Sequence, residues 1–353
     1  MGGLARRTAP GYSDLHTRPE PEMPDLAASR DRRAFLRDAA ACGAHIALLA
    51  AASPLRAARV FGPGPLSRVV HREPWARIEQ VSDGIWAVIS TPLEDRTTLC
   101  NGGIIRGRSG VLVIESFAQP AGAKWLAEKA RELTGRWPDD TVLTHYHGDH
   151  TGGLAGYVLD GRRPRTRSTV TTRDLVQAQD RQRGADPASD KSAMLAGSQA
   201  IDPARESSID LGDRSVRIIP RDGHTKSDVT VEIDEPAVVF CGDLVWNRMF
   251  PNYVDAVPSR LAAAVGGLVR DRADTVYVPG HGPLADARDL RLYIEVIDAV
   301  EAAARKAAET GTSAAEAASG FRLPVPAAEW TLFSPRYFET AIGAWLKELR
   351  PGT

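Results

Sequence analysis

Residues 144–150 read THYHGDH and place three histidines and one aspartate in a single short turn. An apolar run, TVLTH at 141–145, leads into this turn and is typical of a short buried strand. Two groups at positions i and i+2 beyond a strand end can face one ion, and groups at i+4 and i+5 can then face a second. Imidazole and carboxylate groups together suit Zn²⁺, and also Fe or Mn. The turn therefore predicts a metal site that uses His145, His147, Asp149 and His150.

Three more candidate ligands follow strand-like runs further along the chain: His224 in DGHTKSD, Asp243 in CGDLVW and His281 in PGHGP. Glycine adjoins each of them, as expected where the backbone bends closely around an ion. The chain has eight histidines, and every one beyond residue 71 belongs to the candidate set. A lone buried histidine is more often an ordinary core residue. Five at strand ends beside glycines or acids indicate a common site instead.

The order of predicted elements favours two mixed sheets over a doubly wound parallel sheet. Strand-like runs and helical patterns do not alternate strictly, so we expect two packed sheets with helices on their outer faces. Residues 160–213 are polar and arginine-rich, and we expect one or two helices with loops there. The expected strand-like runs lie at 78–90, 101–116, 141–145, 215–224, 229–234, 237–243 and 275–282, and we expect the run at 101–116 to be a hairpin that turns at Arg108–Gly110. The expected helices lie at 119–135, 258–271, 285–309 and 335–349.

The amino-terminal part of the chain resembles an export signal. Arg32 and Arg33 precede a mild, alanine-rich apolar run at 39–52, which is typical of a twin-arginine signal. This run is shorter than the roughly 20 apolar residues that cross a bilayer, so we expect no stable membrane anchor. We predict a leader over residues 1–58, whether the chain starts at Met1 or at Met23, and then a linker over 59–76. The mature protein would be periplasmic or secreted and would use the twin-arginine export machinery.

Composition narrows the remaining possibilities. A chain of 353 residues with 43% hydrophobic and 25% charged residues is an ordinary globular protein. The formal net charge of −1, without a basic cluster interleaved with aromatics, gives no reason to expect a nucleic-acid partner. The three cysteines have no C-x-x-C spacing, which excludes a cysteine zinc knuckle. Cys100 and Cys241 could form a disulfide, but we expect two buried free thiols.

HYHGDH, GHT, GD and PGHG, in this order and spacing, resemble the metallo-β-lactamase superfamily over about residues 78–290. The resemblance implies an αββα four-layer sandwich, here a catalytic domain at 77–290 with a helical extension at 291–353 packed on it. It also implies two zinc ions per chain, with Asp243 bridging them and Asp149 additionally orienting a hydroxide or passing its proton to the leaving group. Glu115 stands where the family has an aspartate that buttresses the ligands, which puts the local geometry in question. The implied ligands are His145, His147 and His224 for the first ion, and Asp149, His150 and His281 for the second.

The resemblance implies a hydrolase that uses a metal-bound hydroxide on a small molecule with an ester, thioester, lactone or amide bond. Asp243 is similar to the aspartate of glyoxalase II-like hydrolases, whereas true β-lactamases of this fold have a cysteine or a non-ligating serine there. Hydrolysis of β-lactam antibiotics remains an alternative. So do a mononuclear iron oxygenase resembling persulfide dioxygenases and a non-catalytic binding protein. More loosely, the leader and the carboxy-terminal helices are similar to exported quinoprotein relay system zinc metallohydrolases. Specificity would lie in cleft loops at about 91–101, 160–210 and 246–257.

Overall fold

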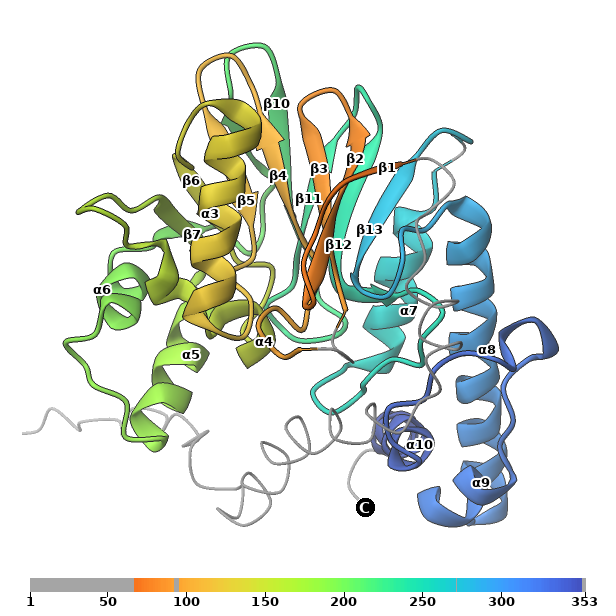
Figure 1. Ribbon diagram of the computed structural model, residues 1–353. Helices are drawn as coiled ribbons and strands as arrows, with labels where there is room; N and C mark the ends of the chain where they lie inside the picture. The colour runs from red at the N-terminus through yellow and green to blue at the C-terminus, as the bar shows by residue number, and fades with distance from the viewer. Residues whose placement is uncertain (1–66, 92–94, 271, 351–353) are drawn as a thin grey trace, which may run out of the picture. The chain divides into compact units, whose positions relative to one another are not determined.

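Two mixed β-sheets lie at the centre of the chain, in a computed structural model that describes residues 67–91, 95–270 and 272–350 (Figure 1). Within these residues the first sheet has eight strands, in the order β1 to β8, and the second has five, in the order β13-β12-β11-β10-β9. The first sheet consists of β1 (Arg68–Arg72), β2 (Ala76–Ser82), β3 (Ile85–Ser90), β4 (Gly102–Arg106), β5 (Val111–Ile114), β6 (Asp140–Val142), β7 (Arg165–Thr169) and β8 (Gln199–Ile201). The second consists of β9 (Ser207–Asp210), β10 (Ser215–Pro220), β11 (Val229–Ile233), β12 (Val238–Trp246) and β13 (Val276–His281).

Both sheets change from antiparallel to parallel pairing along their width. Strands β1 to β5 form an antiparallel meander, and β5 to β8 are parallel to one another. Strands β9 to β12 are antiparallel, and only β12 and β13 pair in parallel. A parallel pair needs a crossover connection, and helices supply it here. This topology brings the ends of β5, β6, β12 and β13 to the candidate ligands.

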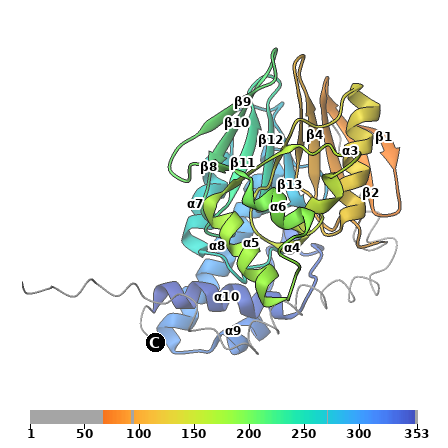
Figure 2. The ribbon, with the colours of Figure 1, turned by 90° about the vertical axis from the view of Figure 1, so that its left-hand side faces the viewer.

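Helices lie outside the sheets (Figure 2). Helix α3 illustrates how the sequence sets their limits, since Pro120 occupies its first turn and Gly135 caps it in a left-handed conformation with φ 76°. No helix in the described part of the chain is both long and apolar enough to cross a membrane. The α-helices among the described residues are α3 (Pro120–Thr134), α4 (Gly148–Thr151), α5 (Val170–Gln182), α6 (Asp190–Ala196), α7 (Pro258–Leu268), α8 (Ala287–Thr310), α9 (Ala314–Gly320) and α10 (Arg336–Leu349). Two short 3₁₀ helices, η1 (Leu154–Tyr157) and η2 (Val325–Ala327), accompany them.

Three apolar cores lie between these layers and hold them together. Residues of β3, β4 and β5 meet residues of β10 to β13 in the core between the two sheets, where Phe240 and Ile105 are buried. A second core joins the first sheet to α3 through Trp125 and Leu126. A third joins β12 to α7, α8 and α10, and includes Leu261. The predicted sandwich of two mixed sheets flanked by helices is therefore confirmed.

The sequence-based element assignment was wrong in three places. The linker predicted at 59–76 contains β1, a half-exposed edge strand whose basic ends obscure its apolar centre. The run at 78–90 is two strands, because Gly84 turns the chain with a positive φ of 69°. The segment 160–213 holds β7, β8 and β9 besides its two helices, since these strands are too short and polar to show a period. The predicted leader lies outside the described residues.

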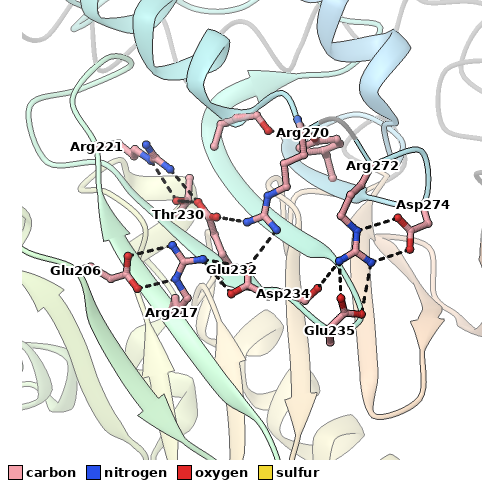
Figure 3. Close-up of polar contacts among 12 residues, drawn as sticks. Glu206, Arg217, Arg221, Thr230, Glu232, Asp234, Glu235, Arg270, Arg272 and Asp274 are labelled. Atoms are coloured by element: carbon pink, nitrogen blue, oxygen red, sulfur yellow. Dashed lines mark hydrogen bonds and ion pairs between the residues drawn. The ribbon is translucent and has the colours of Figure 1, made fainter.

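Paired charges, instead of a helix, cover part of the outer face of the second sheet (Figure 3). Side chains alternate along β11, so Glu232 points outward where Val231 and Ile233 point into the core between the sheets. Glu232 is only 3% exposed and accepts hydrogen bonds from Arg221, at 3.0 Å, and from Arg270. The network also includes Glu206, Arg217, Asp234, Glu235, Arg272 and Asp274. Its central carboxylate is held by two guanidinium groups in place of water.

Candidate metal centre

The turn after β6 positions four of the seven predicted ligands. Strand β6 ends at Val142, and the chain then runs through His145 to His147, which is the N-cap residue of the four-residue helix α4. His145 and His147 thus lie before the helix, while Asp149 and His150 lie on it. Tyr146 is 8% exposed and packs in the core between the first sheet and α3. Tyr146 therefore packs in the core between the two ligands on either side of it.

The other three predicted ligands come from the second sheet and its loops. His224 follows β10, Asp243 lies within β12, and His281 ends β13. A glycine is required beside Asp243, because a Cβ atom at Gly280 would lie 1.9 Å from the Asp243 Oδ1 atom. Gly242 has a positive φ of 53°, which side-chain-bearing residues rarely adopt. The parallel pairing of β12 and β13 can therefore bring a carboxylate and an imidazole together at one sheet edge.

The structure brings all seven predicted side chains together in two adjoining groups. Within each group the potential ligand atoms lie within 4.8 Å of one another. We call them the first cluster, which is His145, His147, His224 and Asp243, and the second cluster, which is Asp149, His150 and His281.

Asp243 contacts both clusters through different oxygen atoms. Its Oδ2 lies 3.3 Å from His224 Nε2 and 3.9 Å from His145 Nε2. Its Oδ1 lies 3.1 Å from His150 Nε2 and 3.2 Å from His281 Nε2. One carboxylate thus faces the ligand atoms of both clusters, which is the arrangement expected of a bridging group.

The donor set fits divalent cations of the zinc type. The Nε2 atoms of His145, His150 and His281 are buried and have no hydrogen-bond partner among the described residues. Buried polar atoms are seldom left in this state, since each costs about 1–3 kcal/mol when it is unsatisfied. Imidazole nitrogens with carboxylate oxygens are common ligands of zinc and iron. Cations bound within the two clusters would give these three Nε2 atoms the partners that they lack.

The electrostatics of the two clusters differ. In the first cluster, burial lowers the pKa of His145 well below its usual value and lowers the pKa of His224 to about 3, which favours the neutral imidazole that binds a metal. In the second, burial opposes protonation of His281, but the carboxylates of Asp243 and Asp149 raise its pKa to about 9. His147 of the first cluster differs from its neighbours, because burial opposes its protonation but the hydrogen bond to Asp255 raises its pKa. A cation bound at His281 would displace a proton.

Glu115 buttresses the second cluster from behind. Its buried carboxylate lies 3.0 Å from the Nδ1 atom of His150 and accepts a hydrogen bond from the Thr144 hydroxyl. His150 thus lies between two carboxylates, with Nδ1 facing Glu115 and the opposite nitrogen Nε2 facing Asp243. The presence of glutamate where an aspartate is usual put the local geometry in question. The longer side chain still reaches the ligand, from a residue with a positive φ of 72°.

Two further residues orient ligands and were missed in the sequence. Asp255 Oδ2 lies 3.1 Å from the Nε2 atom of His147, so that the other ring nitrogen, Nδ1, faces His224 at 3.0 Å. Asn101 donates to the carbonyl oxygens of Pro279 and Gly282, both at 2.8 Å, on either side of His281. Asp255 does lie in the predicted cleft loop 246–257, but nothing in its sequence neighbourhood resembles a ligand motif.

Both described cysteines are buried and free, as expected. The Cys241 thiol donates to the Val239 carbonyl oxygen within β12, and Cys241 belongs to neither cluster. The Cys100 thiol lies 3.0 Å from the carbonyl oxygen of Asp149 and thus packs under α4. Neither thiol takes the place of Asp243 as a ligand.

The chain is similar to known metallohydrolases. The family model described as the metallo-beta-lactamase superfamily matches residues 96–299. The hydroxyacylglutathione hydrolase of Acidiphilium cryptum (strain JF-5) is 28% identical over 177 residues, which cover 50% of this chain and 63% of that protein. The metallo-beta-lactamase type 2 of Bacillus sp. (strain 170) is 23% identical over 217 residues, which cover 59% of this chain and 77% of that protein. The chain thus spans less than two thirds of the length of the first of these relatives.

Two solved structures share the fold. The stereoselective inverting sec-alkylsulfatase Pisa1 from Pseudomonas sp. superposes with a TM-score of 0.60 at 15% identity, over 78% of this chain and 50% of that chain. The metallo-beta-lactamase FIM-1 from Pseudomonas aeruginosa, in its mono-zinc form, superposes with a TM-score of 0.51 at 19% identity, over 65% of this chain and 97% of that chain. Because both sequence identities are below 25%, these two comparisons show a shared fold and nothing about activity.

Proposed function

The chain belongs to the metallo-β-lactamase superfamily, and on this premise we propose that it is a metal-dependent hydrolase with two divalent cations, zinc in the first instance. The observation that carries the proposal is the position of Asp243, whose two oxygens face the two clusters. His145, His147 and His224 would hold the first ion, and Asp149, His150 and His281 the second. Cations bound there would supply Lewis-acid polarisation of the substrate and would acidify a water molecule toward neutral pH.

Asp149 is proposed to handle the proton of the nucleophile. Its side chain is 25% exposed, so it is the predicted ligand most open to a substrate. Burial alone would raise its pKa, but the neighbouring His150 and His281 lower it to about 2. At neutral pH the carboxylate is therefore ionised and can accept a hydrogen bond from water. Such a group can orient the attacking water and pass its proton to the leaving group.

The proposed substrate is a small molecule with an ester, thioester, lactone or amide bond. The hydroxyacylglutathione hydrolase relative and the aspartate at position 243 support this range. The test is a screen of thioesters, lactones, phosphoesters and β-lactams with zinc-loaded protein, with Asp149→Asn as the matched control. We expect turnover of at least one carbonyl class and a loss of about 10²-fold or more in the control. Equal turnover by both proteins would contradict the role of Asp149.

Hydrolysis of β-lactams is the second candidate, because two relatives are metallo-β-lactamases. Against it, Asp243 stands where true β-lactamases of this fold have cysteine or a non-ligating serine, and Cys241 points elsewhere. The screen separates the two candidates directly. The iron oxygenase alternative differs in metal content, since it would give one iron per chain and oxygen consumption. A relation to quinoprotein relay system metallohydrolases stays a prediction.

Export by the twin-arginine route is a proposal that depends on the sequence alone. Arg32 and Arg33 before a mild apolar run support it, and these residues lie outside the described part of the chain. Changing both arginines to lysines should retain the protein in the cytoplasm, while the unchanged chain reaches the periplasm. Fractionation of cells that produce each version gives the answer. Continued appearance of the lysine version in the periplasm would remove the proposal.

A further inference from the structure

The carboxy-terminal part of the chain, beyond the match to the family model, packs on strand β12 next to the metal centre. The family model ends at residue 299, whereas helices α9 and α10 and the segment between them follow it. Phe250 donates to the Thr331 carbonyl oxygen at 2.9 Å, and Thr331 donates to the Arg248 carbonyl oxygen at 3.1 Å. These bonds fix the segment around Thr331 beside the residues that follow β12. Phe333 and Trp246 share one apolar core.

Contacts between aromatic rings connect this segment to one predicted ligand. The ring of Phe333 lies 5.9 Å from the ring of Trp246, measured between centroids, and the two meet edge to face. The ring of Trp246 in turn lies 4.1 Å from the imidazole of His281. Trp246 and His281 are also partners in the pairing of β12 with β13. The imidazole of His281 therefore has a large aromatic ring against one side.

Packing alone determines where the Trp246 ring lies. Its Nε1 atom is buried and has no hydrogen-bond partner among the described residues. Its side chain is 5% exposed, and Phe333 is 7% exposed, so water supports neither ring. Removal of the Phe333 ring would open a cavity into which Trp246 could turn. His281 would then lose the surface that restricts its own rotation.

We propose that Phe333 is a positioning residue for the second cluster, because it holds Trp246 against the imidazole of His281. The inference rests on the proposed function, in which His281 binds a cation. It makes the carboxy-terminal extension part of the metal centre as well as a packed appendage. A ligand that can rotate binds a metal more weakly, and partners that orient ligands typically affect metal affinity by about 10–100-fold.

Phe338 provides a matched control within the same extension. Its ring packs on Phe250, at 4.8 Å between centroids, and on Phe321, at 4.9 Å. No ring contact joins Phe338 to Trp246 or His281 among the described residues. Phe338→Ala should thus lower thermal stability, as Phe333→Ala does, without reaching the ligand.

The experiment is a zinc titration against a chromophoric chelator, with the wild-type protein and with Phe333→Ala and Phe338→Ala. In Phe333→Ala we expect one of the two zinc affinities, that of the second cluster, to fall by about 10-fold or more, and the other to change by less than about 3-fold. Phe338→Ala should keep both affinities at wild-type values, although its melting temperature falls. Phe333→Leu, which keeps apolar volume in the core but lacks the ring that meets Trp246, should show a smaller loss of about 3-fold in the same affinity, and it serves as the test variant if Phe333→Ala does not fold.

Two results would overturn the inference in distinguishable ways. If the wild-type protein binds two zinc ions and both alanine variants bind them equally well or equally badly, the role of Phe333 is refuted and the proposed function stands. If the wild-type protein binds fewer than two ions, the proposed two-metal function fails together with the inference.

Discussion

Replacing Asp255 with alanine should weaken metal binding at the first cluster by about 10- to 30-fold. Asp255 lies at hydrogen-bond distance, 3.1 Å, from the Nε2 atom of His147, and because a carboxylate only accepts, this contact keeps the proton on Nε2 and leaves Nδ1 unprotonated, as a metal ligand must be. Loss of such an orienting partner costs about 10–100-fold in metal affinity. The Asp255 side chain is 20% exposed, so water can replace part of the lost bond. The lower part of that range, about 1.4–2 kcal/mol of binding free energy, is therefore expected.

Asparagine at the same position separates the hydrogen bond from the charge. The amide oxygen of Asp255→Asn can still accept from Nε2, so the His147 tautomer should be kept, and the loss should be only about 3-fold. Asp180 supplies a control of similar burial, because its side chain is 13% exposed and pairs with Lys191 at 2.9 Å. Asp180→Ala should leave metal affinity unchanged.

The assay is competition for zinc with a chelator of known affinity, followed by a fit to two stepwise binding constants. Both binding constants are needed to show which cluster loses affinity. Among the predicted ligands, Asp255 contacts His147, which belongs to the first cluster. Unchanged affinity of Asp255→Ala would refute the proposed orientation of His147. An equal loss in Asp180→Ala would show that general destabilisation, and not the contact with His147, lowers the affinity.

Other predictions follow from single side chains. Asp243→Ala should lower occupancy of the second cluster more than the first, since Oδ1 lies closer to that cluster's nitrogens, and unchanged zinc stoichiometry would count against bridging. Glu232→Gln should lower the free energy of unfolding by about 1–3 kcal/mol, because the carboxylate is buried between two guanidinium groups. Glu235→Gln, where the side chain is 79% exposed, should change it little, and equal effects in urea unfolding would contradict the reasoning. Burial raises the pKa of Asp228 to about 7, so ionisation of this group removes stability as the pH rises from about 4 to about 7. The stability of chelator-treated Asp228→Asn relative to wild type should therefore be higher at pH 8 than at pH 5, and a difference independent of pH would sink this prediction.

The sequence predicted the layers and the ligand set because both depend on local patterns. Buried strands such as β3 are continuous apolar runs, and α3 begins at a proline and ends at a glycine. The ligands stand at strand ends beside glycines. These glycines are visible in the sequence, and they are needed because the backbone approaches the site closely there. The structure brings all of them within reach of two points. Their roles as ligands stay predictions until a metal is measured.

What the sequence did not predict depends on contacts between distant segments. Asp255 is an ordinary loop aspartate until the fold places it beside His147. Strand β1 is too short and too basic at its ends to show a period, and only its pairing with β2 reveals it. The contact of Phe333 with Trp246 joins residues that α7, β13, α8 and α9 separate in the sequence. The sequence predicted a helix at 335–349, but not that Phe333, just before it, would contact Trp246, which packs on the proposed ligand His281.

The most direct test is a crystal structure of the zinc-loaded protein with anomalous scattering recorded on both sides of the zinc absorption edge. We predict two zinc peaks per chain. His145, His147 and His224 should surround one peak, Asp149, His150 and His281 should surround the other, and Asp243 should lie between them. A single peak, or peaks at residues outside the two clusters, would contradict the proposed centre.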